Sequence, residues 1–187
     1  NAAPRNVAAD IGRLFGEAVA KKQDQDLIAL FDGFSTAVGD GTSAINAAAI
    51  FNALSTLRGN ALNINDCAVV LHPKIAYDLK ANLTNTFANA NANDLANEAL
   101  RSGFVGSLAG MRIFETSNMS NTGTAGDYKG GAFHRDAIAL AEMQGLKIET
   151  QRDASLRADE IVATAVYGVG EIHDTYGVEL HHDSSIQ

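Results

Sequence analysis

Three consecutive segments decide the fold: Leu146-Lys-Ile-Glu-Thr-Gln151, Arg152-Asp-Ala-Ser-Leu-Arg-Ala-Asp-Glu160 and Ile161-Val-Ala-Thr-Ala-Val-Tyr-Gly-Val-Gly-Glu-Ile172. The first segment alternates apolar and polar residues, which is the period-two pattern of a half-buried strand. The third has β-branched and small residues on both of the faces that a strand would present, which predicts a strand covered on both faces. Two strands joined by a polar tip form a long hairpin. Because the stretch carries no catalytic motif, we interpret it as a structural rib.

A turn and a short strand are predicted directly after this hairpin, and a long helix is predicted at the start of the chain. Residues 174–177 are typical of a turn, and residues 178–181 of a last short strand. At the other end of the chain, apolar residues recur at spacings of three and four, at Val7, Ile11, Leu14, Phe15 and Ala18. The pattern resumes after a polar stretch and reaches about Phe31. We expect one long helix, with a break near Gln23 as the alternative.

The middle of the chain predicts two helices around a buried strand. Thr42 or Ser43 is expected to cap the first helix. The apolar face of this helix comprises Ala47, Ile50, Phe51, Leu54 and Leu57. Gly59 is expected to end the helix. Residues 67–71 predict a buried strand that leads directly into a helix opened by Pro73. The apolar face of that second helix comprises Ile75, Leu79 and Leu83.

Two polar loops and three short apolar segments complete the pattern. Residues 84–97 are rich in Asn and Thr without a sustained period, which favours an exposed loop with a short helix near its end. Residues 103–110 predict a glycine-rich bend before a strand at residues 111–115. Residues 117–131 predict a second polar loop. Residues 132–134 and 137–141 then return to the core and lead into the hairpin.

The composition fits a globular domain and weighs against several classes of protein. The chain has 187 residues, 46% of them hydrophobic, which suits one domain or two small lobes that share a core. The single cysteine, Cys67, excludes an internal disulfide framework, and its apolar neighbours indicate a buried, inert thiol. Nothing resembles a signal peptide, and the apolar runs are too short to span a membrane. The formal net charge of −8 argues against a protein that reads nucleic acid, which needs a basic surface.

The best candidate for chemistry is the segment Glu171-Ile-His173-Asp174, with His181-His182 close behind. On a strand, Glu171 and His173 point to the same face, a spacing that can serve a metal. The competing interpretation places these histidines in solvent near a turn and an exposed terminus. The absence of any recognisable ligand spacing favours that second interpretation. The sequence also lacks a Gly-x-Ser-x-Gly elbow and the glycine loop of a phosphate site.

The tip of the predicted hairpin mixes charges of both signs, at Arg152, Asp153, Arg157, Asp159 and Glu160. It is either a solvated hairpin end or one half of an ion-pair contact between two copies of the chain. An isolated exposed ion pair contributes only ~0–1 kcal/mol, so such a contact matters when it is repeated at many interfaces.

The order of these elements, together with three local patterns, resembles the major capsid protein of tailed bacteriophages. This fold, of the Hong Kong 97 type, is also used by encapsulin shells. The patterns are Val69-Val-Leu-His-Pro-Lys-Ile-Ala-Tyr-Asp-Leu79, then Ala109-Gly-Met-Arg-Ile-Phe114 with the preceding Gly106, and Ala132-Phe-His-Arg-Asp-Ala137. Each pattern is weak alone, and their order across most of the chain carries the resemblance.

The resemblance implies an α+β fold with two lobes. Residues 1–42 and 143–177 would form a peripheral lobe, made of the long helix and the long hairpin. Residues 43–142 and 178–187 would form an axial lobe, a mixed sheet flanked by helices. The usual N-terminal arm and the extended loop before the long helix are missing here. The chain also begins at Asn1 rather than Met, so either it is a fragment or a processed product, or neighbouring subunits are laced together by other elements.

The resemblance further implies a non-enzymatic shell subunit that assembles into pentamers and hexamers of an icosahedral head enclosing DNA. It implies no cofactor, and as partners further copies of the chain, with scaffolding, portal or decoration proteins besides. Assembly in the bacterial host cytoplasm and a final place in the virion are expected. The Asn-rich loop, with Asn89, Asn91 and Asn93, would lie at the symmetry axis of each pentamer or hexamer. The acidic charge suits an inner surface that does not trap the packaged DNA.

Three other functions are kept as alternatives. The first is a metal-dependent hydrolase or isomerase that uses Glu171, His173 and a third ligand. The second is an encapsulin-like protein compartment. The third is a surface or secreted adhesive domain, against which the lack of disulfides weighs mildly.

Overall fold

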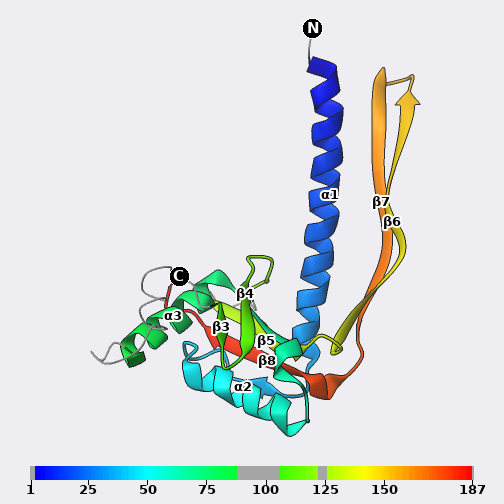
Figure 1. Ribbon diagram of the computed structural model, residues 1–187. Coiled ribbons are helices and arrows are strands. Elements are labelled where there is room, and N and C mark those ends of the chain that lie inside the picture. The colour runs from blue at the N-terminus through cyan, green and yellow to red at the C-terminus, as the bar shows by residue number, and fades with distance from the viewer. Residues whose placement is uncertain (1–2, 88–105, 122–125, 187) are drawn as a thin grey trace.

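The computed structural model of the protein describes residues 3–87, 106–121 and 126–186. It has two parts: a body built on a mixed sheet, and a long helix beside a long hairpin that extend together away from it (Figure 1). The α+β class expected from the sequence is therefore confirmed. None of the helices in the described ranges combines the length and the apolar character needed to cross a membrane.

Six strands form the sheet of the body, in the spatial order β1-β8-β5-β2-β4-β3. Their bounds are Ala37–Val38 for β1, Cys67–Leu71 for β2, Ser107–Leu108 for β3, Met111–Glu115 for β4, Asp127–His134 for β5 and Gly177–Asp183 for β8. The pairs β1–β8 and β2–β4 are parallel, and the other neighbours are antiparallel. Because β8 lies between β1 and β5, segments far apart in the sequence complete one sheet.

One face of β5 and β8 packs against the short 3-10 helix η1 (Leu30–Gly33) and the residue that follows it. Phe31 of η1 lies over Gly131, where an added Cβ would come within 2.8 Å of the ring. Phe34 lies over Gly177 in the same way, at 2.1 Å. The Phe133 ring also packs against Phe31 in a tilted arrangement, with ring centroids 5.0 Å apart. This face therefore carries an aromatic layer, and its two closest approaches to the backbone leave room only for glycine.

The opposite face of the sheet packs against α2 (Ala47–Gly59), which contacts both β5 and β8. α3 (Pro73–Phe87) begins directly after β2, as the sequence predicts, and also contacts α2. The expected apolar face of α3, Ile75, Leu79 and Leu83, is buried. The 3-10 helix η2 (Ile64–Asp66) connects α2 to β2.

The ends of α2 differ from the sequence-based prediction. Its cap is Asn46 rather than Thr42 or Ser43, because the Asn46 side chain accepts a hydrogen bond from Ala49 N–H at 2.9 Å. Gly59 is the last helical residue, and the left-handed residue beyond the helix is Ala61, with φ of 60°. On the predicted apolar face, Phe51 is wrong as a core residue, since it is 47% exposed.

The long N-terminal helix α1 (Ala3–Ala29) is continuous and passes into η1 at Leu30. The alternative of a break near Gln23 is therefore wrong. Beside α1 lies the hairpin of β6 (Ile138–Asp153) and β7 (Ala158–Glu171), which forms a separate two-stranded sheet (Figure 1). We call α1 together with β6 and β7 the projecting arm.

Both hairpin strands are longer and more exposed than predicted. β6 is exposed from Leu140 to Arg152, so a half-buried strand is wrong within the single chain. Coverage of β7 on both faces is also wrong, because exposed and partly covered residues alternate along it from Ile161. The pattern is that of a strand with one face turned to a neighbour, and α1 contacts this hairpin.

Three further expectations need correction. The predicted loop at residues 117–131 ends earlier, because β5 begins at Asp127, and β8 pairs with it from that residue on. Of the predicted core segment 137–141, only Ala137 is buried, since the chain leaves the body there. Residues 84–87 of the predicted Asn-rich loop belong to α3, which continues to Phe87. The rest of that prediction, including the short helix expected near its end, falls outside the described residues.

Candidate functional site

The hairpin of the projecting arm is paired along its whole length, with two local irregularities. Ile138 lies opposite Glu171 at the base, and Asp153 lies opposite Ala158 at the far end. The register shifts between Glu142 and Gln144 and again before Lys147, which marks β-bulges in β6. A bulge bends a strand and redirects a side chain. Met143 lies within the first of these shifts, and its side chain is 90% exposed.

The tip of the hairpin, residues 154–157, is held by the carboxylate of Asp153. Asp153 Oδ1 accepts hydrogen bonds from the Ser155 hydroxyl at 2.6 Å and from the N–H groups of Ser155 at 2.8 Å and Leu156 at 3.2 Å. These bonds, the Ser155 hydroxyl first, hold the pKa of Asp153 below its usual value. Arg157 adopts a left-handed conformation with φ of 53°. The tip is therefore a defined turn that points Leu156 into solvent.

Of the charged residues predicted for the tip, only Arg157 lies in the turn, because Arg152 and Asp153 belong to β6, and Asp159 and Glu160 belong to β7. Arg152 is opposite Asp159 and Gln151 is opposite Glu160, so both acidic residues belong to β7 rather than to the turn. In the described part of the chain, neither Arg152 nor Arg157 forms an ion pair. These guanidinium groups are consequently available to a second molecule. The other predicted contact residues, Asn89, Asn91 and Asn93, lie outside the described residues.

A hydrogen-bonded trio joins the hairpin to α1. The Tyr167 hydroxyl donates to Asp26 Oδ2 at 2.8 Å, and Lys22 Nζ lies 2.6 Å from Asp26 Oδ1. Lys22 and then Tyr167 lower the pKa of Asp26, while the bond to Asp26 raises the pKa of Tyr167. This joint fixes the direction of the hairpin relative to the helix. The sequence contains no motif for it, because the two elements are far apart in the chain.

Beneath the arm, charged side chains gather on the η1 face of the sheet. Lys129 on β5 pairs with Asp32 of η1 and lies 3.2 Å from Glu179 Oε1 on β8. These partners, Asp32 foremost, raise the pKa of Lys129 against the opposing effect of burial. The pairing ties the base of α1 to the middle of the sheet.

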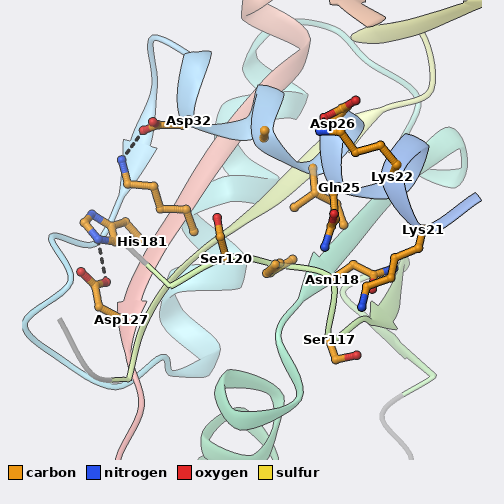
Figure 2. A pocket seen from close by; sticks show the side chains of 14 residues that line it. Lys21, Lys22, Gln25, Asp26, Asp32, Ser117, Asn118, Ser120, Asp127 and His181 are labelled. Carbon is orange, nitrogen blue, oxygen red and sulfur yellow. Dashed lines mark hydrogen bonds and ion pairs between the residues drawn. The ribbon is translucent and has the colours of Figure 1, made fainter. Parts of the chain in front are cut away.

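The same face continues to His181, whose Nε2 lies 2.7 Å from Asp127 Oδ1. Figure 2 shows Asp32 at one end of this row and His181 reaching Asp127 at the other, with Lys21, Lys22 and Gln25 of α1 across an open hollow. The hollow has a volume of about 780 Å³. Its lysines and carboxylates already pair in part with one another, which gives a polar surface rather than a binding cavity.

His182 faces away from that hollow and lies under the loop between β1 and α2. It is 4% exposed, and its Nδ1 lies 3.3 Å from the carbonyl oxygen of Ser43. Burial lowers the pKa of His182. The loop follows closely, because Gly41 N–H donates to the His181 carbonyl at 3.1 Å and Gly39 has φ of 91°. The expectation that His181 and His182 are simply solvated is therefore wrong.

The metal site kept as an alternative is not formed by the described residues. β7 ends at Glu171, and the N–H groups of Ile172 and His173 both turn to the Ala137 carbonyl, at 2.8 and 3.2 Å. The His173 ring instead approaches Tyr176, with centroids 4.7 Å apart. In the described ranges, no group of three His, Cys, Asp or Glu side chains is placed to hold a metal ion.

Comparisons with known proteins show the family and the fold of the chain. A family model described as "Phage capsid protein" matches residues 1–178. No curated protein sequence matches the chain. A solved structure from Mycobacterium phage Che8 is 28% identical with a TM-score of 0.73, and the match covers 91% of this chain and 61% of that one.

Two further solved structures show the same fold at lower identity. A capsid structure of the cyanophage P-SCSP1u is 20% identical with a TM-score of 0.72, covering 95% of this chain and 66% of that one. An encapsulin complex from Synechococcus elongatus is 14% identical with a TM-score of 0.67, covering 100% of this chain and 69% of that one. The chain thus spans slightly under two thirds of the two phage proteins.

Proposed function

The chain belongs to the phage capsid protein family, and from that premise we propose that it is the shell-forming part of a major capsid protein. In this proposal, copies of the protein assemble with one another into a closed icosahedral head. The work of the protein is burial of surface between subunits, at roughly 25 cal/mol per Å² of apolar area before the costs of association. A closed shell requires many repeated contacts of fixed geometry rather than one active site.

The projecting arm is the observation that supports this function most directly. A two-stranded sheet alone is at best marginally stable in water. Here the hairpin has α1 as its neighbour, yet β6 stays exposed from Leu140 to Arg152 and β7 exposes Val162 and Val166. We propose that neighbouring subunits cover this surface in the shell.

The proposal includes the two lobes and their roles. Residues 1–42 and 143–177 form the peripheral lobe, and residues 43–142 and 178–187 form the axial lobe. Around a symmetry axis, the axial lobes of five or six copies meet. The Asn-rich loop, with Asn89, Asn91 and Asn93, is proposed to lie at that axis.

The charged tip is proposed to meet groups of opposite sign on a neighbouring subunit. Arg152 and Arg157 would meet carboxylates, and Asp153, Asp159 and Glu160 would meet basic groups. Since exposed pairs contribute little individually, the effect comes from repetition over the shell. Reversing Arg152 and Arg157 to Glu should leave circular dichroism unchanged and lower particle yield, most at low salt where screening is weakest. Normal yield at low salt would show that the tip charges are only solvated.

Further partners follow from the same proposal. The shell encloses DNA without reading its sequence, since a net charge of −8 disfavours tight phosphate binding. Scaffolding, portal or decoration proteins are proposed as additional partners during assembly in the host cytoplasm. The final location is the virion.

The protein is proposed to act without catalysis. The test replaces Glu171 with Gln and His173 with Ala together, because both side chains are exposed. His181 is not a suitable target, since its contact with Asp127 belongs to the body. Assembly should be unchanged in the double variant. Stoichiometric bound metal that disappears in this variant would contradict a purely structural role.

Expression of the full-length protein, followed by negative-stain microscopy and sedimentation, tests the function itself. We expect closed particles of uniform size. Particles that package DNA when formed in infected cells support the phage head, whereas particles that enclose protein cargo support an encapsulin-like compartment. A protein that stays monomeric at high concentration overturns the proposal.

A further inference from the structure

Met143 and Leu156 differ from every other large apolar side chain in the described residues. They are the two most exposed, at 90% and 76%, and both belong to the hairpin. Each lies where the backbone leaves the regular ladder. Met143 lies at the bulge in β6, and Leu156 lies in the turn that Asp153 holds.

Their exposure has a local structural cause. A bulge turns a side chain away from the direction that strict alternation would give it. At the tip, the bonds to Asp153 and the left-handed Arg157 fix the turn and leave Leu156 outside it. Because the turn is already ordered, Leu156 loses little conformational freedom when it is buried by a partner.

We infer that Met143 and Leu156 are the two apolar anchors by which the hairpin binds a second copy of this chain. This inference rests on the proposed function and names the residues that carry the contact. Protein interfaces typically have a few buried anchors surrounded by polar residues that contribute little. In this interface the tip charges form the polar rim, and the two apolar side chains supply most of the affinity.

The charges around the anchors favour a second copy over other partners. Beside Leu156, the carboxylates of Asp153, Asp159 and Glu160 outnumber the guanidinium groups of Arg152 and Arg157. This excess repels the phosphates of nucleic acid and of acidic lipid. A partner that also carries both positive and negative groups can pair with the carboxylates and with the guanidinium groups. Another copy of the chain has that mixture.

The two anchors bind different surfaces of the neighbouring copies. At about 3.3 Å per residue, the ten residues of β6 from Met143 to Asp153 separate the bulge from the tip by roughly 33 Å. Met143 has a flexible, polarisable side chain that adapts to an irregular surface, whereas Leu156 presents a fixed shape. The arm is therefore fastened at its middle and at its end.

The first test measures the lowest concentration of full-length protein at which particles form. Met143→Ser and Leu156→Ser should each raise it about tenfold, the effect of losing one anchor. Ile172→Ser is the matched control, because Ile172 is an exposed apolar residue that lies just beyond the end of the hairpin. The control should change the value by less than about twofold. Thermal melts of the free subunits should be the same for all four proteins.

The second test follows burial directly through thiol labelling. Cys67 is buried, so Met143→Cys and Leu156→Cys each introduce one reactive thiol. Both should react with maleimide in free subunits and be protected in particles. Assembly at the wild-type concentration in both Ser variants, or thiols that react equally in particles, overturns the inference while the proposed function stands. Protection that appears only after a second viral protein is added overturns the choice of partner. A wild-type protein that forms no particles overturns the proposed function, and the anchors with it.

Discussion

The two sheets of this chain differ in the burial of their residues. In the six-stranded sheet of the body, β8 is buried from Gly177 to Leu180, with helices or aromatic rings on both faces. In the two-stranded sheet of the arm, β6 is exposed from Leu140 to Arg152. The difference lies in what surrounds the strands, since both contain β-branched and small residues.

The difference between the two sheets shows which strands are covered by residues of their own chain. The body obtains its neighbours from its own chain, so its stability is a property of the monomer. The arm has only α1, and the joint at Tyr167 and Asp26 fixes its direction without covering it. The body is thus the folding unit, and in the proposed shell the arm is the surface that other subunits complete.

The largest expected effect contrasts a body leucine with an arm leucine. Leu57 is fully buried, so Leu57→Ala should lower the free energy of unfolding by about 2–5 kcal/mol, through lost apolar burial and a cavity. Leu156→Ala should change it by less than about 0.5 kcal/mol, because the side chain is already in water. Urea denaturation of the free subunits measures both. Equal losses would show that the arm is as much a part of the folded core as the body.

A second substitution tests the close packing of the body face that carries η1. A Cβ on Gly177 would lie 2.1 Å from the Phe34 ring, so Gly177→Ala must displace that ring. We expect a loss of about 1–3 kcal/mol in the free energy of unfolding. Gly168→Ala in the arm is the control, since a Cβ there meets nothing within 4 Å. A wild-type denaturation midpoint for Gly177→Ala would contradict the aromatic layer.

A third prediction concerns pH, which should affect the body through His182 and His72. Burial lowers the pKa of His182 and of His72, whereas an unfolded histidine titrates near 6.5. As pH falls from about 6.5 toward the lowered folded pKa, the unfolded state binds more protons and the body loses stability. Each histidine contributes at most about 1.4 kcal/mol per pH unit. His182→Gln should make the decline shallower without abolishing it, as urea denaturation between pH 7 and 5 would show. The same slope in both proteins would contradict a buried neutral His182.

The smallest effect is expected at the joint of the arm. Asp26→Asn should bring the pKa of the Tyr167 hydroxyl back toward its usual value, because the carboxylate that raises it is gone. Since the pKa of Asp26 is lowered, the joint should persist on acidification past the usual carboxylate range and be lost only below it. Ultraviolet titration of both proteins, with Tyr167→Phe to identify the signal, measures the change. An unchanged Tyr167 titration would mean that the bond is absent in solution.

The sequence predicts helices and strands best where their patterns are local. The period of α1, the run of residues 67–71 and the apolar face of α3 each show one unambiguous repeat, and the structure has these elements. The cap of α2 was assigned wrongly because Thr42, Ser43 and Asn46 can all cap a helix. Only the packing of the loop over β8 places Asn46 at the correct position.

The candidate site was harder to predict, because exposure depends on the neighbours of a strand and not on its own residues. Residues 161–172 are as apolar as a buried strand, and nothing local shows that one face has no partner within the chain. The bulge at Met143 has no sequence signal, since only the pairing with β7 reveals the register shift. The contacts of Asp26 with Tyr167 and of His181 with Asp127 join distant segments, which a single sequence does not disclose.

Hydrogen–deuterium exchange, compared between free subunits and assembled particles, tests most directly whether the arm is the surface that assembly completes. Amides of β2, β5 and β8 should be protected to the same extent in both states, because their neighbours come from the same chain. Amides of β6 and β7, above all near Met143 and at residues 154–157, should exchange rapidly in free subunits and become protected in particles. Strong protection of the hairpin already in the free subunit, or none gained on assembly, would contradict the account.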